Sequence, residues 1–151
     1  MSTTVARPAD LLDLAGTELG ISRWREIRQP DVDAFADATG DRQWIHVDSD
    51  RARSGPFGGT IAHGFLTLAL FIPLLSELLV IEQVGMSINY GLNRVRFPAP
   101  VPVGSRVRLR AVLAAAEPVP GGVQITIDGT IERDGGDKPA CVLQAVHRHL
   151  A

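Results

Sequence analysis

Residues 64–79 have the sequence GFLTLALFIPLLSELL, which is apolar on nearly every face of the helix that it predicts. A helix that is apolar all round is normally enclosed by the rest of its domain. Pro73 has no N–H group to donate, so we expect it to kink this helix or to end its regular part. The stretch therefore predicts one long, buried helix in the middle of the chain.

The half of the chain that follows this helix has the two-residue hydrophobic period of β-strands. Alternation begins at Met86 and changes phase before Val95, which predicts a β-bulge within residues 91–94. Three more strands are predicted in residues 106–113, 123–133 and 139–150, and the sequences PVPGG and DGGD form turns between them. An antiparallel sheet wrapped around the apolar helix would bury all of its faces, which is an α+β arrangement.

The half of the chain before the apolar helix mixes helices and loops. A weak short helix is predicted in residues 9–15, within an N-terminal extension that covers residues 1–18, and a strand is predicted in residues 21–28. Pro30 suits the first turn of a helix that Gly40 should end. The polar residues 41–59 then predict a long loop, and loops of that length are usually functional or disordered. The sheet should thus have five strands.

Length and composition favour a single soluble domain over residues 1–151. The net charge of −2 gives no reason to expect a nucleic-acid partner. The N-terminus lacks the pattern of a signal peptide, and the most apolar run is too short to cross a bilayer, so we expect a cytoplasmic protein without membrane contact. Cys141 stands alone, which excludes an internal disulfide and a cysteine-based zinc site, and its alternating apolar surroundings predict a buried structural thiol.

The residues with the clearest chemical potential are Asp41 and His46, five positions apart at the start of the polar stretch. A carboxylate and an imidazole held together are suited to one water molecule, since one group can accept a proton while the other donates one. Such pairs also occur by chance. Asp41 could simply cap a turn, and His46 could be an ordinary loop residue.

A second candidate feature is the sequence TIAHG at residues 60–64, where the apolar helix opens. The first amides of a helix have no intrahelical acceptor, and the positive helix end favours negative charge. The N–H of Gly64 could therefore stabilise an enolate oxygen that forms on a thioester carbonyl. Gly64 could equally be required only for close packing at the start of the helix.

The sequence FADATGDRQWIHVDSDRARSGPFGGTIAHGFLTLAL (residues 35–70) resembles the MaoC-like hydratases, the (R)-specific enoyl-CoA hydratase group, and in particular a nodulation protein N-like, actinobacterial branch. That family has an Asp-x-x-x-x-His pair, a variable loop and then a His-Gly at the start of the central helix of a hot-dog fold. Asp41, His46 and His63-Gly64 match these positions. The sequence NYGLNRVRFPAPVPVGSRVR (residues 89–108) is similar to the strand and connection that follow in the family.

The resemblance implies a homodimer whose sheets join, with a reaction that needs no metal or other cofactor beyond the coenzyme A of the substrate. It implies that Asp41 and His46 hold the water and that the Gly64 amide polarises the thioester carbonyl of an acyl-CoA or acyl-carrier substrate. Phe97 is implied to line the acyl or pantetheine tunnel. One departure concerns Trp44, where many members have proline, so preference for acyl chain length cannot be carried over from relatives.

Other polar residues have weaker expected roles. His63 is expected to hold the loop against the helix, and His147 and His149 are expected to be solvated on the last strand, without a third ligand for a metal. Arg94 and Arg96 are possible partners for the phosphates of coenzyme A, although alternating arginines are more often the wet face of a strand.

The leading functional hypothesis is reversible addition of water to a trans-2-enoyl thioester, which gives an (R)-3-hydroxyacyl thioester. A thioesterase of the same fold would direct the water at the carbonyl carbon instead, and the position of the Asp-His pair before the helix favours the hydratase. A non-catalytic acyl-binding subunit is a third hypothesis, and it predicts binding without turnover.

Overall fold

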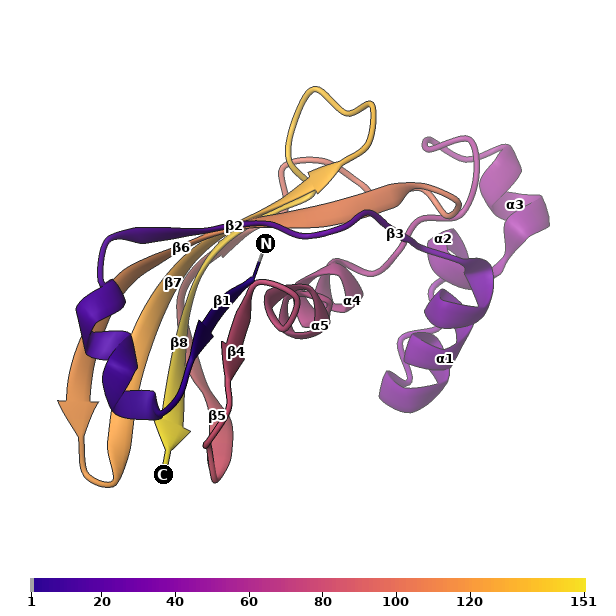
Figure 1. Cartoon of the computed structure of the whole chain (residues 1–151). Helices are drawn as coiled ribbons and strands as arrows, with labels where there is room; N and C mark the ends of the chain where they lie inside the picture. The colour runs from indigo at the N-terminus through magenta and orange to yellow at the C-terminus, as the bar shows by residue number, and fades with distance from the viewer. Residues whose placement is uncertain (1) are drawn as a thin grey trace.

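The computed structural model describes residues 2–151, and its main feature is a strongly curved antiparallel sheet (Figure 1). The strands are hydrogen-bonded in the order β2-β6-β7-β8-β5, and a short strand, β3, also pairs with β6. Their bounds are β2 Thr17–Ile21, β3 Arg25–Glu26, β5 Met86–Arg96, β6 Arg106–Val119, β7 Gly122–Arg133 and β8 Cys141–Leu150. The predicted α+β hot-dog arrangement, a sheet curved around central helices, is confirmed.

The strand count differs from the expected five because the predicted strand at residues 21–28 is replaced by two strands: β2, which starts earlier and ends at Ile21, and β3, with Trp24 in the gap between them. A separate parallel pair joins β1 (Thr3–Val5) to β4 (Leu79–Ile81). Between β1 and β2 the chain forms a 3-10 helix, η1 (Pro8–Leu14), in the region of the predicted weak helix. Leu11 of η1 is fully buried, so this N-terminal segment contributes to the core.

The central helix is shorter and more broken than expected. It consists of α4 (Gly64–Ala69) and α5 (Phe71–Leu75), and Leu79 already belongs to β4. The break precedes Pro73 because a proline leaves the carbonyl four residues earlier, that of Ala69, without a helical donor. The prediction of one long helix through residue 79 was therefore wrong, while the expected effect of Pro73 is confirmed.

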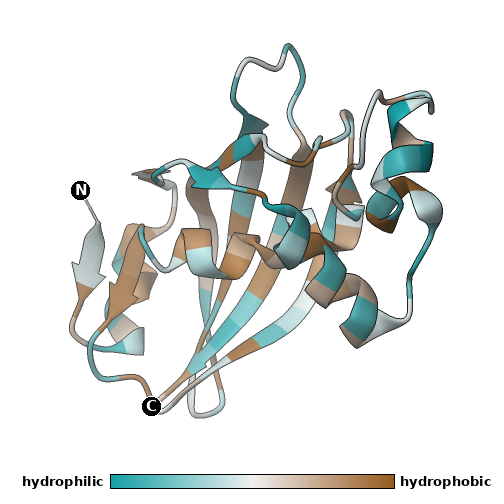
Figure 2. Cartoon of the chain, turned by 90° about the vertical axis from the view of Figure 1, so that its right-hand side faces the viewer, coloured by the Kyte–Doolittle hydropathy of each residue, from teal (hydrophilic) through white to brown (hydrophobic). Residues whose placement is uncertain are grey.

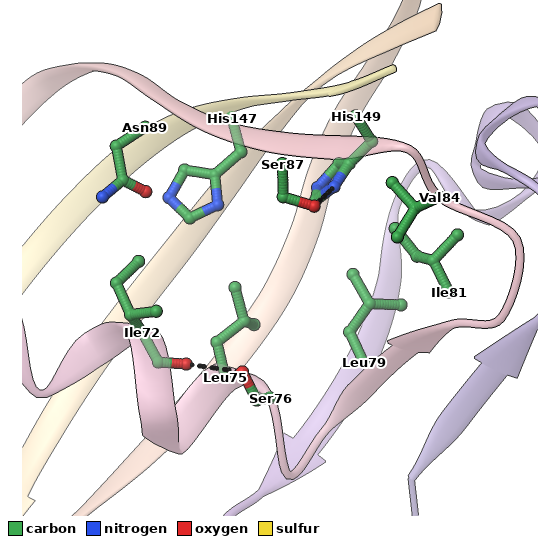
Figure 3. A pocket seen from close by; sticks show the side chains of 10 residues that line it. All are labelled: Ile72, Leu75, Ser76, Leu79, Ile81, Val84, Ser87, Asn89, His147 and His149. Atoms are coloured by element: carbon green, nitrogen blue, oxygen red, sulfur yellow. Dashed lines mark hydrogen bonds between the residues drawn. The ribbon is translucent and has the colours of Figure 1, made fainter. Parts of the chain in front are cut away.

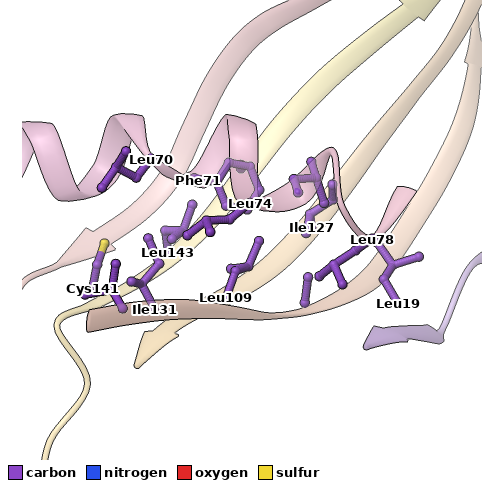
Figure 4. Packing of buried hydrophobic residues seen from close by; sticks show 14 of the residues in the cluster. Leu19, Leu70, Phe71, Leu74, Leu78, Leu109, Ile127, Ile131, Cys141 and Leu143 are labelled. Atoms are coloured by element: carbon purple, nitrogen blue, oxygen red, sulfur yellow. The ribbon is translucent and has the colours of Figure 1, made fainter. Parts of the chain in front are cut away.

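The expectation that this helix is enclosed on all sides was also wrong for the single chain. One side of α4 and α5 packs on the sheet, where Phe71 and Leu74 meet Ile127 and Leu143 (Figure 4). The opposite side is open, and the side chain of Phe65 is 70% exposed. None of the helices in residues 2–151 is long and apolar enough to cross a membrane.

The strands show why the two-residue period arises. Along β7 the odd-numbered residues from Val123 to Ile131 are buried and the even-numbered residues are more exposed, so apolar residues such as Ile127 alternate with polar ones. Figure 2 shows such hydrophobic and hydrophilic bands along the strands. The register of β5 against β8 shifts between Asn89 and Gly91 and again between Leu92 and Arg94. The bulge predicted within residues 91–94 is therefore confirmed.

Three helices lie together at one end of the sheet, at the opposite end from η1 (Figure 1). Helix α1 (Gln29–Thr39) matches the predicted helix and ends at Gly40, whose φ of 79° is left-handed. The residues expected to form a long loop instead contain two short helices, α2 (Trp44–Val47) and α3 (Ser49–Arg53).

Cys141 lies at the start of β8, where it is fully buried, as predicted. Burial raises the pKa of its thiol from 9.0 to about 11 because the charged thiolate is poorly solvated there. Only the thiolate reacts with alkylating reagents, so we expect native Cys141 to react with iodoacetamide at least about a hundredfold more slowly than the thiol of the chain unfolded in guanidinium. Mass spectrometry against time would measure both rates. Equal rates would contradict the assignment of Cys141 to the core.

Candidate active site

Asp41 is placed by the end of helix α1. Gly40 closes the helix by donating its N–H to the carbonyl of Ala36 at 2.9 Å, and its left-handed backbone turns the chain. The next amide, that of Asp41, donates to the hydroxyl oxygen of Thr39 at 3.3 Å. The carboxylate of Asp41 therefore follows a fixed turn, although the residue itself is exposed.

His46 is buried on the short helix α2, where the sequence alone suggested a loop. Its Nδ1 lies 2.7 Å from the carbonyl oxygen of Ile61, and a carbonyl can only accept, so Nδ1 carries the hydrogen. The amide of Ile61 donates in turn to the carbonyl of Ile45 at 3.0 Å. Because Nδ1 is occupied in this way, Nε2 is the nitrogen of His46 that is left for proton exchange.

His63 links the two candidate residues. Its Nε2 donates to the backbone carbonyl of Asp41 at 2.9 Å, and its ring stacks on that of His46 with 3.8 Å between centroids and 24° between planes. His63 also immediately precedes the start of α4. The expected role of His63, holding the loop segment against the helix, agrees with these contacts.

Asp41, His46 and His63 each offer a ligand atom, and the three atoms lie within 4.8 Å of one another. Proximity alone would allow an ion at this place. The two imidazole rings are nearly parallel, however, so their lone pairs run side by side instead of converging on one point. The arrangement suits proton exchange better than tetrahedral coordination by both histidines.

Gly64 is the first residue of α4, and its amide is among those that a helix leaves without an intrahelical acceptor. A Cβ atom on Gly64 would lie 3.3 Å from the ring of Phe97, which is tight for such a contact. Phe97 meets Phe65 edge to face, with 6.4 Å between ring centroids, and both rings are exposed. The helix start is thus bordered by an aromatic wall that is open on one side.

Arg94 and Arg96 lie on the other face of the sheet. Arg94 pairs in register with Gln144 and Arg96 with Val142, whereas the helices pack over the residues between them on β8, such as Leu143. The guanidinium of Arg96 donates to the carbonyl of Val95 at 2.7 Å. Within one chain these two arginines therefore do not border Gly64, and their predicted contact with phosphate stays a prediction.

The sequence did not reveal that two polar residues, Gln29 and Thr60, hold the segments of the site together. The amide of Gln29 donates to the carbonyl of His46 at 2.8 Å, and the hydroxyl of Thr60 donates to the side-chain oxygen of Gln29 at 2.6 Å. Helix α1 is in this way joined to both ends of the segment that carries His46. No local pattern could have revealed contacts between residues 17 and 31 positions apart.

Trp44 packs within its own loop. Its ring lies against Gly55, where a Cβ atom would come within 3.0 Å, and the guanidinium of Arg51 lies 4.3 Å from the ring centroid. Trp44, which replaces the proline of many family members, therefore holds the segment from α2 to Gly55 in place.

The expectation that His147 and His149 are solvated was wrong. Both are buried on the inner face of β8, and burial lowers both pKa values. The two histidines alternate with Arg148 along the strand, so the sequence shows that they share a face. Strand periodicity does not show which of the two faces is covered by the helices.

Comparison with known proteins agrees with this architecture. Residues 11–131 match the family described as the MaoC like domain, and the chain belongs to that family. It is 54% identical over 144 residues to 3-hydroxyacyl-thioester dehydratase Z of Mycobacterium tuberculosis (strain ATCC 25618 / H37Rv), with 95% of each chain covered.

Two further similarities extend the comparison. The chain is 46% identical over 135 residues to nodulation protein N of Rhizobium leguminosarum bv. viciae, with 87% of this chain and 84% of the relative covered. Among solved structures, the (R)-hydratase from A. caviae involved in PHA biosynthesis superposes with a TM-score of 0.71 at 27% identity, over 88% of this chain and 94% of that one.

Proposed function

We propose that this protein is a hydro-lyase that adds water reversibly to a trans-2-enoyl thioester and forms an (R)-3-hydroxyacyl thioester. The observation that carries the proposal is the convergence of Asp41 and His46 at the start of α4, tied together through His63. The names of the similar dehydratase and (R)-hydratase support the same reaction class.

In the proposed mechanism a water molecule lies between the carboxylate of Asp41 and Nε2 of His46. As the water oxygen forms a bond to C3, one of its O–H bonds breaks and the proton passes to this pair. The π electrons of the C2–C3 double bond move toward the thioester carbonyl and give an enolate. Return of a proton from the pair to C2 completes the addition, so no electrons are gained or lost and no metal or redox cofactor is needed.

The Gly64 amide is the proposed donor to the enolate oxygen. A fixed backbone N–H stabilises charge as it develops and needs no reorganisation at the moment of reaction. The exposed aromatic pair of Phe65 and Phe97 borders this position, and we assign to Phe97 a place in the wall of the acyl or pantetheine tunnel. Coenzyme A is the proposed carrier. The predicted contact of Arg94 or Arg96 with its phosphates would require these phosphates to lie at the outer face of the sheet, where both arginines are found.

A panel of 2-enoyl-CoA esters of increasing length tests the proposed function. Hydration removes the conjugated double bond, so its absorbance should fall on addition of the purified chain, and chiral analysis of the product should give the (R) enantiomer. Release of free coenzyme A without 3-hydroxyacyl product would identify a thioesterase. Binding without either product would identify an acyl-binding subunit.

We also propose a homodimer that forms through β5. This strand ends the sheet, so one of its edges has no neighbour in the single chain, and four of its large side chains are exposed: Met86, Ile88, Tyr90 and Leu92. Pairing of two β5 edges would cover them. The expected cytoplasmic location stays a prediction.

Light scattering of the wild type should give about twice the chain mass of 16.2 kDa at micromolar concentration. Leu92→Lys places a charge on the open edge strand and should shift the mass to that of one chain. Leu12→Lys alters a comparably exposed leucine on η1 and should keep the dimer. A wild-type protein of one-chain mass would contradict the proposal.

A further inference from the structure

A cavity of about 270 Å³ lies between helix α5, strand β4 and the paired strands β5 and β8 (Figure 3). Its apolar side is formed by Ile72, Leu75 and Leu79. A second cavity of about 310 Å³ shares Ile72 with it and continues to Leu68 on α4. The two cavities form one groove beside the central helices, and α4 begins at the proposed oxyanion donor, Gly64.

The side of the groove opposite the helices is polar. The pairs Ser87–His149 and Asn89–His147 lie directly across from each other on β5 and β8, so their side chains share one face of the sheet. Figure 3 shows all four pointing toward the helices. The next residues in the same rows on β7 are the buried Val123 and Ile125. On the inner face of the sheet, these four polar side chains therefore occur at the groove, and their neighbours on β7 are apolar.

His149 is incompletely satisfied. Its Nδ1 lies 2.8 Å from the hydroxyl of Ser87, while its Nε2 is buried without a hydrogen-bond partner among residues 2–151. A buried polar nitrogen without a partner costs free energy, so its retention calls for an explanation. A ligand oxygen in the groove would give Nε2 of His149 the hydrogen-bond partner that residues 2–151 do not supply.

The charge state of the wall restricts the ligand. Burial lowers the pKa of His147, and burial together with His147 lowers the pKa of His149 to about 4, so both rings are neutral at physiological pH. A neutral imidazole offers one donor and one acceptor. The adjacent Arg148 points to the other face, with its guanidinium 3.6 Å from the ring centroid of Tyr90. The wall therefore suits an uncharged oxygen better than a carboxylate.

We propose that this groove binds the distal part of an acyl chain that carries an uncharged oxygen, either a hydroxyl or a carbonyl, which hydrogen-bonds to the polar wall at Asn89, His147 and Nε2 of His149. The hydrocarbon before that oxygen packs on the apolar residues of α4 and α5. The inference deepens the proposed function, on which it rests for the identity of the ligand as an acyl thioester. The preferred substrates are accordingly oxygenated acyl thioesters.

Isothermal titration calorimetry with saturated acyl-CoA esters tests the inference. These esters have no C2–C3 double bond, so they report binding without hydration. They are compared in pairs of equal length, one ending in a hydroxyl and the other in a methyl group. At lengths that reach the polar wall, the hydroxylated ester should bind at least about tenfold more tightly, as one buried hydrogen bond provides. Shorter pairs should show no difference.

Variants then locate the preference. Asn89→Leu changes an exposed side chain and so should not disturb folding, and it should reduce the preference to less than about threefold. His147→Leu should also reduce the preference for the hydroxylated ester to less than about threefold. Gln144→Leu is the matched control, since it alters β8 on the face turned away from the groove, and it should keep the full preference.

Three results would overturn the inference: equal or weaker binding of the hydroxylated ester at every length, tighter binding of a carboxyl-tipped ester, or a crystal structure in which side chains of a second copy fill the groove. Hydration of a short 2-enoyl-CoA is measured alongside. If the protein prefers the hydroxylated ester but does not hydrate the short ester, only the proposed function is wrong. If it hydrates the short ester but shows no preference, only the inference about the groove is wrong.

Discussion

Asp41→Asn and His46→Gln should each reduce kcat for enoyl-CoA hydration by at least about a hundredfold, the usual effect of removing a positioned acid–base group. Asparagine cannot accept the proton of water as a carboxylate does. Glutamine retains a polar group but cannot exchange a proton as Nε2 of His46 can. Steady-state kinetics with a short 2-enoyl-CoA would measure both losses.

Asp37→Asn is the matched control for these two variants. It removes a carboxylate on α1, the helix that ends just before Asp41. The ion pair of Asp37 with Arg42 is exposed at both ends and should contribute little to stability. Its activity should stay near that of the wild type. Circular dichroism melting curves should show that all three variants are folded. Near-normal turnover by Asp41→Asn or His46→Gln would exclude the assigned chemistry.

Gly64→Val should reduce turnover by about a hundredfold to a thousandfold, the range seen when one oxyanion donor is lost. The amide cannot be removed by changing the side chain, so the substitution acts sterically. Its Cβ would already lie 3.3 Å from the ring of Phe97, and the branched methyl groups would project where the thioester is proposed to bind. The loss should appear in kcat as well as in KM, because the contact strengthens as negative charge develops.

Gly59→Val provides the control for Gly64→Val. It adds the same side chain five residues earlier, at a position where a Cβ meets no atom within 4 Å, and should leave turnover within about twofold. A structure with a bound acyl thioester would test the donor directly, with its carbonyl oxygen expected within about 3.2 Å of the Gly64 nitrogen. A carbonyl oxygen turned to a side chain or to bulk water would rule out the helix-start mechanism.

The fold was largely predictable because its strands have a clear two-residue period and its central segment is unusually apolar. The limits of the helix were less predictable. Propensity favoured continuing it through residue 79, yet Leu79 pairs in parallel with Thr3, a partner that lies 76 positions away. Likewise, the split between β2 and β3 depends on where each meets β6, which is a tertiary property.

The candidate site was predictable as a set of residues and less so as a geometry. Spacing and family resemblance pointed to Asp41, His46 and Gly64, while the tautomer of His46 follows only from its distance to the carbonyl of Ile61. The bracing by Gln29 joins segments whose proximity no local pattern encodes. The burial of His147 could not be predicted either, since the covered face of β8 is decided by the packing of the helices.

The order of strands in the sheet has a consequence for synthesis of the chain. β5 is hydrogen-bonded to β8, the last strand, and the two strands β6 and β7 that are made between them pair with each other first. Until β8 has left the ribosome, β5 lacks this neighbour, and its apolar edge is available to chaperones or to other nascent chains. The emergence of residues 141–150 gives β5 its partner within the chain, so we expect assembly of two copies through β5 to follow the synthesis of β8.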